Sequence, residues 1–448
     1  MKAPSDHEAW NEWDALTTNR KSLLEEVASK HANLLAGAEK DQWEKSSARD
    51  RLNRMADPKG PFGQSPLHPR AADLSKRFTE SEKRFTPTLV ARELDKPRPT
   101  KVLERGEYDR PIGEAVQPGI PSVMGALPDD APRNRLGLAQ WLISRDNPLV
   151  SRVLVNRIWQ RVFGEGIVRS PEDFGLQGKQ PTHPEILVWL SVELQENDWD
   201  LQHMLKLMLT SRTFRQQSAQ RTDIFEDPEN LWYSRGPSYR LDAEVIRDMA
   251  LWSSRLLDGH MGGEGVKPYQ PAGYWQHLNF PARKWQAGKG DEIYRRSLYT
   301  FVFRGFPHPA MVAFDAPSRE ICTVRRIRTN TPLQSFVTLN DEAYVEFAQA
   351  LAHRIFAEGG DSTADRLKFA LRLTLAKPVE ASRLAALTEL FNGELAHYQE
   401  QPDAAKALYG QTVPLPPGAS LREMAALTVV ANVLLNICLL YTSDAADE

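Results

Sequence analysis

A dense group of arginines gives the sequence its most chemically suggestive segment. Four fall within ten residues, and they are Arg319, Arg325, Arg326 and Arg328. A guanidinium group is planar and presents its N–H donors as a fork, which suits bidentate binding of carboxylates and sulfate esters. Asn330 follows, just before a predicted helix N-terminus that also favours anions. We therefore predict that the four arginines and Asn330 bind an anionic ligand.

The same arginines also have a structural interpretation. Acidic residues lie in the segment itself and in a predicted helix upstream, and they are Asp242, Glu244, Asp248, Asp315 and Glu320. Ion pairs with these carboxylates would use the guanidinium groups to hold the fold together. The sequence leaves both interpretations open.

Three residues near the arginines are candidates for catalysis. His308 lies between two prolines, seven residues before Asp315, and a histidine and a carboxylate in one loop can perform acid/base chemistry. Cys322 is a candidate nucleophile, although a lone cysteine is more often a small buried hydrophobe. No third ligand occurs at a recognisable spacing and no His-Glu-x-x-His occurs, so we predict no metal site.

Aromatic side chains gather in a loop rich in glycine and proline. They are Tyr269, Tyr274, Trp275 and Trp285. Trp275 and Trp285 are candidates for stacking on sugar rings. The alternative, equally supported by the sequence, is that the rings pack together as the core of their own loop.

The composition excludes several classes of function. The chain of 448 residues has a formal net charge of −3, which gives no overall attraction to nucleic acid or anionic membranes. No apolar run reaches the length of a membrane span. With two cysteines and no Cys-x-x-Cys-His, we expect neither a disulfide framework nor a covalent haem, and we predict no cofactor in this chain.

The two ends of the sequence need separate interpretations. Residues 1–13 are polar and lack the apolar segment of a signal peptide, so we expect that the chain as given is cytosolic or has lost its true N-terminus. The last eleven residues, 438–448, fit one reading frame of a transposase-type sequencing adapter. We therefore expect a non-native tail after Ile437.

Hydrophobic periodicity predicts a mainly α protein, with long Pro/Gly-rich loops and a few short strands. Residues 8–50 show the spacing of one long helix, so residues 1–55 are predicted to form a helical arm. Prolines and glycines break the pattern from residue 56, and residues 56–132 are predicted to be a linker and an opening segment. Residues 133–437 form the predicted main helical domain, with one main core.

Within the main domain, apolar spacing predicts a short helix that contains residues 136–142 and ends by 146–148, and further helices over 149–163, 201–209, 363–375, 380–399 and 419–436. Two capping boxes, Thr182 with Glu185 and Thr331 with Gln334, predict further helix starts, the second opening a helix to about residue 356. A helix is also predicted from Asp242 to Asp258. Residues 297–304 are the best strand candidate.

Several motifs along the main domain carry a family resemblance. They include Asn156-Arg157-Ile158-Trp159, Phe163-Gly164-Glu165-Gly166, Arg240-Leu241-Asp242-Ala243-Glu244, Phe314-Asp315-Ala316-Pro317 and Thr329-Asn330-Thr331-Pro332-Leu333-Gln334. Together they resemble the planctomycete-type, cytochrome-associated C-terminal domain of unknown function, the PSD family (domain of unknown function 1553). The resemblance covers roughly residues 85–437.

The resemblance implies a setting rather than a reaction. Its members are typically secreted or periplasmic, with a haem-binding, cytochrome-like domain upstream. It therefore implies a periplasmic or extracellular location, with any haem held by an upstream domain. It carries over no catalytic residues.

Three functions follow as hypotheses. The first is an accessory module that recognises an anionic ligand or polysaccharide. The second is a hydrolytic or redox enzyme with a pocket around His308, Asp315 and Arg326. The third is a structural domain that docks its own haem module. Whether the chain is an enzyme is left open.

Overall fold

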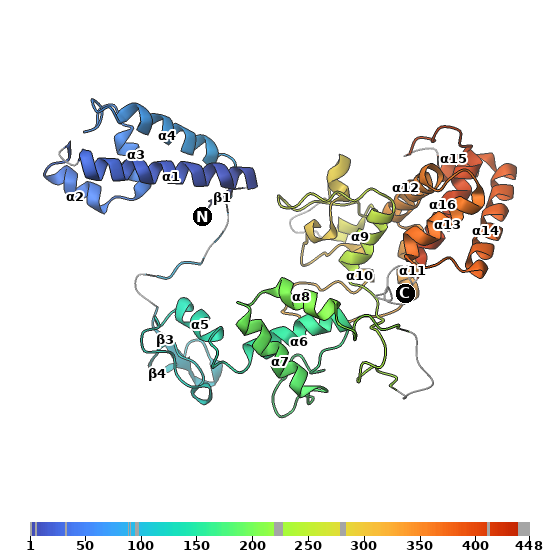
Figure 1. The fold of residues 1–448 in the computed structure, drawn as a ribbon, viewed down its shortest axis with the longest axis horizontal. Coiled ribbons are helices and arrows are strands. Elements are labelled where there is room, and N and C mark those ends of the chain that lie inside the picture. The colour runs from blue at the N-terminus through green and yellow to red at the C-terminus, as the bar shows by residue number, and fades with distance from the viewer. Residues whose placement is uncertain are drawn as a thin grey trace. The chain divides into compact units, whose positions relative to one another are not determined.

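The structure of the chain is a computed structural model. The structure describes residues 2–4, 7–31, 34–87, 89, 91–94, 98–218, 227–277, 284–409 and 413–437. The predicted adapter-derived tail, 438–448, lies outside the described residues. The chain divides into two compact units, one of residues 1–115 with 261–264, the other of residues 116–260 with 265–448. Figure 1 shows their elements.

The first unit is a small helical domain. It contains α1 (His7–Lys30), α2 (Ala38–Lys45), α3 (Ala48–Met55) and α4 (His68–Glu82). Helix α4 lies against α1 and α3 (Figure 1), and the three bury a core that includes Leu16, Leu23, Leu52, Phe62 and Phe78. The single helix predicted over 8–50 is therefore wrong. Helix α1 ends at Lys30, and this end lets the following helices fold back onto α1.

Strands are short in the described part of the chain. β1 (Lys2–Pro4) pairs antiparallel with β2 (Phe85–Pro87), with Ala3 opposite Thr86. β3 (Thr100–Leu103) and β4 (Pro111–Val116) form a second two-stranded sheet. The 3-10 helix η2 (Glu104–Gly106) lies between β3 and β4, and η3 (Ser122–Met124) follows β4.

The second unit begins with a helical subdomain. α5 (Arg135–Leu142), α6 (Val150–Phe163), α7 (Pro184–Glu196) and α8 (Leu201–Leu209) agree closely with the predicted helices, except that the side chain of Thr182 does not cap α7. The side chain of Asp200 accepts hydrogen bonds from the N–H groups of Gln202 and His203 and so caps α8. The inner faces of α6, α7 and α8 share a core.

The rest of the second unit is a larger helical bundle. It comprises α9 (Ala243–Ser253), α10 (Pro309–Ala313), α11 (Pro332–Asn340), α12 (Glu342–Glu358), α13 (Thr363–Leu375), α14 (Ala381–Glu400), α15 (Pro402–Leu408) and α16 (Leu421–Asn436). Helix α16 lies against α12, α13 and α14 (Figure 1) and is buried along most of its length.

Two predictions about this bundle are wrong. Residues 297–304 are not a strand: η6 (Ser297–Tyr299) is a 3-10 turn, and η4 (Tyr274–His277) and η5 (Gly290–Tyr294) precede it. The helix predicted to run from Thr331 to about 356 is interrupted at Asp341, whose extended backbone ends α11 while its side chain caps α12.

The mainly α fold class is confirmed by these elements. The expectation of one main core is not, because the second unit encloses two separate clusters of buried apolar residues, one under α6–α8 and one in the α9–α16 bundle. Among the described residues, no helix is long and apolar enough to cross a membrane.

Candidate functional site

The arginine-rich segment, residues 319–330, is irregular and lies between α10 and α11. Residues 324–328 lie beside the C-terminus of α6, and residues 328–330 lead into the first turn of α11. The segment ends at Pro332, the first residue of α11, a position where proline is well tolerated because its missing N–H would have no partner in the helix. The segment is therefore held between the two parts of the second unit.

Arg326 is held by the N-terminus of α9. Its Nη1 and Nη2 atoms donate to the Glu244 carboxylate at 2.6 and 3.1 Å, and Nη1 lies 3.3 Å from Asp242. Burial alone would lower the pKa of Arg326, but these carboxylates more than offset it and raise that pKa. Asp242 also pairs with Arg161 of α6. For Arg326 the structural interpretation is thus correct, because its ion pairs join α9 to the arginine-rich segment.

Asp315 is also fully engaged. Its carboxylate accepts hydrogen bonds from the Arg240 guanidinium, from the Thr329 backbone N–H at 2.7 Å and from the Thr329 hydroxyl at 2.9 Å. Asp315 lies in the left-handed backbone region, with φ 61°, and its side chain reaches Thr329 of the arginine-rich segment. These hydrogen bonds fix the position of Thr329 and therefore constrain the backbone of Arg328 and Asn330 on either side of it.

The guanidinium group of Arg328 lies over the ring of Tyr239. Its guanidinium carbon is 4.2 Å from the centre of the Tyr239 ring, and Nη1 donates to the Gly164 carbonyl at 3.3 Å. The Tyr239 hydroxyl in turn donates to the Arg161 carbonyl at 2.5 Å. Glycine is required at position 164 for two reasons. A Cβ there would come within 2.7 Å of the Tyr239 ring, and the φ of Gly164 is 86°, which other residues rarely adopt. The Nε atom of Arg328 is buried without a partner among the described residues.

One side of Arg328 opens into a groove of about 290 Å³, here called the arginine groove. Its lining comprises Gln160, Arg161, Gly164, Glu165, Val324, Arg325, Arg326, Ile327 and Arg328. Arg325 is exposed and has no ion pair or hydrogen bond to another described residue. Arg319 is 50% exposed and lies 3.9 Å from Glu244, outside the groove lining.

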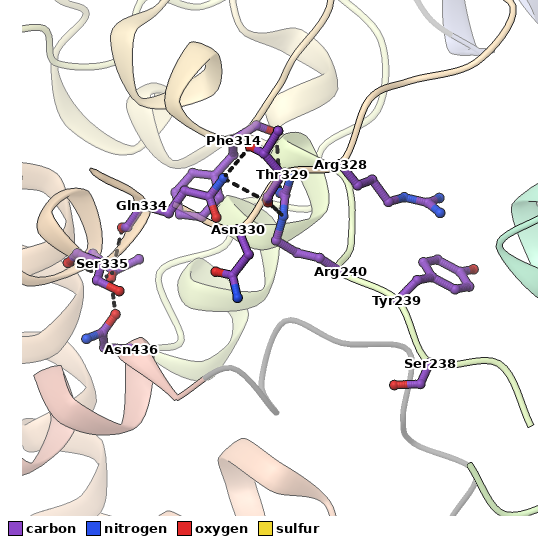
Figure 2. Close-up of a pocket in the computed structure, with 11 residues that line it drawn as sticks. Ser238, Tyr239, Arg240, Phe314, Arg328, Thr329, Asn330, Gln334, Ser335 and Asn436 are labelled. Atoms are coloured by element: carbon purple, nitrogen blue, oxygen red, sulfur yellow. Dashed lines mark hydrogen bonds between the residues drawn. The ribbon is translucent and has the colours of Figure 1, made fainter. Parts of the chain in front are cut away.

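The other side of Arg328 borders a second space of about 430 Å³, here called the amide cavity. Its walls come from the 238–240 segment, from Phe314, from residues 328–330 and from the start of α11, with Asn436 at the end of α16. Figure 2 shows the Asn330 side chain between the Ser335–Asn436 wall and the Ser238–Tyr239 segment. Arg328 is common to the groove and the cavity.

Comparison with known families now decides the assignment that the motifs suggested. Residues 134–391 match PSD1, a protein family of unknown function (DUF1553). The chain belongs to the PSD1 family. The PSD1 match spans the arginine groove and all of the amide cavity lining except Asn436. No curated protein and no solved structure is significantly similar to the chain.

The catalytic candidates of this PSD1 domain have different surroundings. His308 is buried, and its Nε2 atom donates to the Tyr269 carbonyl at 2.9 Å. Burial lowers the pKa of His308 to about 4, so the ring is neutral near pH 7 and its Nδ1 atom has no partner among the described residues. Asp315 binds Arg240 and Thr329, and Cys322 is exposed. A pocket formed by His308, Asp315 and Arg326 stays a prediction.

The aromatic loop packs mainly on itself. Trp275 stacks on Trp285 with ring centres 5.5 Å apart, and Trp275 also contacts Phe303 and Phe306. The indole N–H groups of Trp275 and Trp285 donate to Gln270 and to the Pro268 carbonyl. Trp275 is buried, as a ring in a small local core would be. The two tryptophans thus pack with neighbouring rings, as one of the two interpretations expected, and stacking on sugar rings stays a prediction.

Three residues of the site were missed by sequence reasoning. Arg161, Tyr239 and Arg240 come from distant parts of the chain and position the arginine segment. Arg240 begins a motif that carried the family resemblance, but nothing in its spacing pointed to Asp315, 75 positions away. In the part of the chain that the structure describes, no group of three or more His, Cys, Asp or Glu side chains could hold a metal ion.

Proposed function

We propose that this PSD1 domain is a recognition module for an oxyanion, a carboxylate or a sulfate ester, bound in the arginine groove. The observation that carries the proposal is that Arg325 lines the groove with no described acidic partner, and that Arg328 beside it contacts a carbonyl and a tyrosine ring rather than a carboxylate. A guanidinium fork matches the spacing of oxyanion oxygens and binds them bidentately.

The local charges support this choice of ligand. Asp242 and Glu244 neutralise Arg161 and Arg326, as the ion pairs described above show. Glu165 is the acidic residue in the lining, and it lies 3.8 Å from Arg169. Arg169 also pairs with Glu229 at 2.5 Å, so five arginines face four carboxylates here and one positive charge remains to be balanced. Because the chain as a whole has a net charge of −3, attraction of an anion must come from this local excess.

Isothermal titration of the full chain with glucuronate and with glucose 6-sulfate tests the proposal. Arg325→Ala should weaken binding about tenfold, since a hydrogen bond to a charged group contributes about 1.5–3 kcal/mol. Arg304→Ala is the matched control, because Arg304 is also exposed and does not line the groove. Comparing the two ligands separates carboxylate from sulfate recognition.

The salt dependence gives a second measurement. Binding through exposed guanidinium groups should weaken as salt rises, since screening acts over about 8 Å at physiological ionic strength. If neither anion binds, or if Arg325→Ala and Arg304→Ala bind equally well, the groove is not a recognition site.

A second candidate function is the docking of a neighbouring protein module. The outer faces of α7 and α8 are apolar and exposed, although their inner faces are already buried in the subdomain core. The exposed side chains are Ile186, Val188, Trp189, Val192, Leu201, Leu205 and Leu209. A helix that is apolar all round is normally covered on all sides. The family resemblance names a haem-binding module as the neighbour.

Hydrogen exchange tests the docking function. A purified haem-binding module from a family relative should slow amide exchange in α7 and α8, and Trp189→Glu should abolish that protection. Trp189 is 54% exposed, so this substitution should leave the fold intact. Unchanged exchange in both helices would rule out docking of that module on this face.

A further inference from the structure

The amide cavity presents neutral polar groups that have no partners among the described residues. They are the Asn330 amide, the Ser238 and Ser335 hydroxyls and the Asn436 Nδ2 group. The Asn436 Oδ1 atom is already used, because it accepts a hydrogen bond from Thr338 at 2.6 Å. Amides and hydroxyls both donate and accept hydrogen bonds, so together they can satisfy a ligand that carries several hydroxyl groups.

Two arginines line this cavity, and one of them is already bound to other groups. Arg240 lines the cavity, but its guanidinium is bound to Asp315, to the Thr329 carbonyl at 3.0 Å and to the Phe314 carbonyl at 3.3 Å. Figure 2 shows it turned toward Phe314 and Thr329. Phe314 adds an apolar ring to the lining. Among the described residues that line the cavity, Arg328 at the border is therefore the cation that an anion would find without a carboxylate partner.

The size of the cavity is suitable for a small ligand. Its volume of about 430 Å³ lies within the range of about 300–1,000 Å³ that is typical of small-molecule sites. An apolar ligand would leave the Asn330 and Asn436 amides without hydrogen bonds, which costs free energy. A ring with one apolar face and several hydroxyl groups satisfies both the amides and Phe314.

Arg328 connects this cavity to the arginine groove, since it lines both. We infer that the amide cavity binds a neutral sugar ring, and that the ligand of this domain is an acidic oligosaccharide whose charged residue lies in the groove. This inference rests on the proposed function, because it assigns the anion to the groove. It adds a second contact region, on the other side of Arg328, that selects what is linked to the acid.

The experiment compares three probes on the full chain by isothermal titration: free glucuronate, glucuronate linked to a neutral hexose, and a neutral disaccharide of the same linkage. The linked acid should bind about tenfold more tightly than free glucuronate, because the added ring gains contacts in the cavity. The neutral disaccharide should bind more weakly than the linked acid. A sulfated disaccharide, run alongside, distinguishes the two kinds of acid.

A variant that fills the cavity tests where the neutral ring binds. Ser335→Leu, in the exposed first turn of α11, should reduce the affinity for the linked acid about tenfold and change the affinity for free glucuronate less than about twofold. Ser382→Leu is the matched control, an exposed serine in the first turn of α14. Circular dichroism checks that both variants fold. If Ser335→Leu does not fold, Ser335→Ala serves as the milder variant.

The outcomes separate the two proposals. If free glucuronate binds through Arg325 but the linked hexose adds no affinity, or if Ser335→Leu and Ser335→Ala bind the linked acid like the wild type, this inference is wrong and the proposed function stands. If no acidic probe binds, the proposed function fails, and this inference fails with it.

Discussion

Arginines close together in the sequence divide into two kinds in the structure. Arg326 is committed to Asp242 and Glu244, whereas Arg325 has no described partner and Arg328 rests on Tyr239. The sequence named both interpretations. The structural one is correct for Arg326, and ligand binding by Arg325 and Arg328 stays a prediction. The sequence could not assign the arginines individually, because the partners lie about 80 residues away and depend on how α6 and α9 pack.

The Asp315 carboxylate is predicted to stabilise the fold rather than to bind ligand. Asp315→Asn removes its charge opposite Arg240 but suits the same left-handed backbone, so we expect unfolding in urea to show a loss of about 1–3 kcal/mol. Asp361→Asn, at an exposed position, is the control and should cost less than about 0.5 kcal/mol. Equal stability of the two variants would show that Asp315 does not hold the segment.

His308 should make stability depend on pH. Its pKa is about 4 when folded against 6.5 ordinarily, so on acidification the unfolded chain takes up a proton first. Stability is therefore fully present above pH 6.5 and falls between pH 6.5 and 4, by at most about 3 kcal/mol. His308→Gln, which retains an N–H donor for Tyr269, should remove this loss.

The measurement for His308 is urea unfolding at several pH values, taken as the difference between wild type and His308→Gln. The difference cancels other titrating groups, including Asp341, whose pKa is raised by burial. A difference that does not vary between pH 6.5 and 4 would contradict a buried neutral histidine.

At the scale of elements, helices with strong periodicity were predictable and their neighbours were not. The helices at 135–142, 150–163, 363–375 and 421–436 lie within a residue or two of their predicted positions. The 297–304 segment was apolar enough to suggest a strand. Its backbone is instead bound by the Asp248 side chain and by Val266, contacts that no local pattern encodes.

Helix caps offer a matched test at this scale. Asp200 caps α8 with its side chain, whereas Thr331 makes no such bond at α11 despite its capping-box sequence. Asp200→Ala should therefore cost about 1 kcal/mol in urea unfolding, and Thr331→Ala only a few tenths. The reverse order would show that the predicted capping box forms in solution.

At the scale of the whole molecule, buried apolar residues form three clusters in the described part of the chain. The largest depends on α16, which lies beyond the PSD1 match at residues 134–391. Sequence periodicity predicted that α16 exists. It could not show that this helix lies against α12, α13 and α14, because helix order in a bundle depends on side-chain packing over long sequence distances.

Because α16 is central to the largest cluster, a cavity within it should be costly. Leu434 is fully buried, so Leu434→Ala should lower the free energy of unfolding by about 2–5 kcal/mol. Leu415→Ala is the control, since Leu415 is 47% exposed and should cost less than about 0.5 kcal/mol. Similar stability of both variants would contradict a central position for α16.

The central claim is that the arginine groove binds an oxyanion between Arg325 and Arg328. A crystal structure of the full chain with saturating glucuronate tests it most directly. The account predicts the carboxylate in the groove, with oxygens about 2.7–2.9 Å from guanidinium nitrogens of Arg325 and Arg328. A groove that stays empty at saturating ligand, or a carboxylate bound elsewhere, would contradict the account.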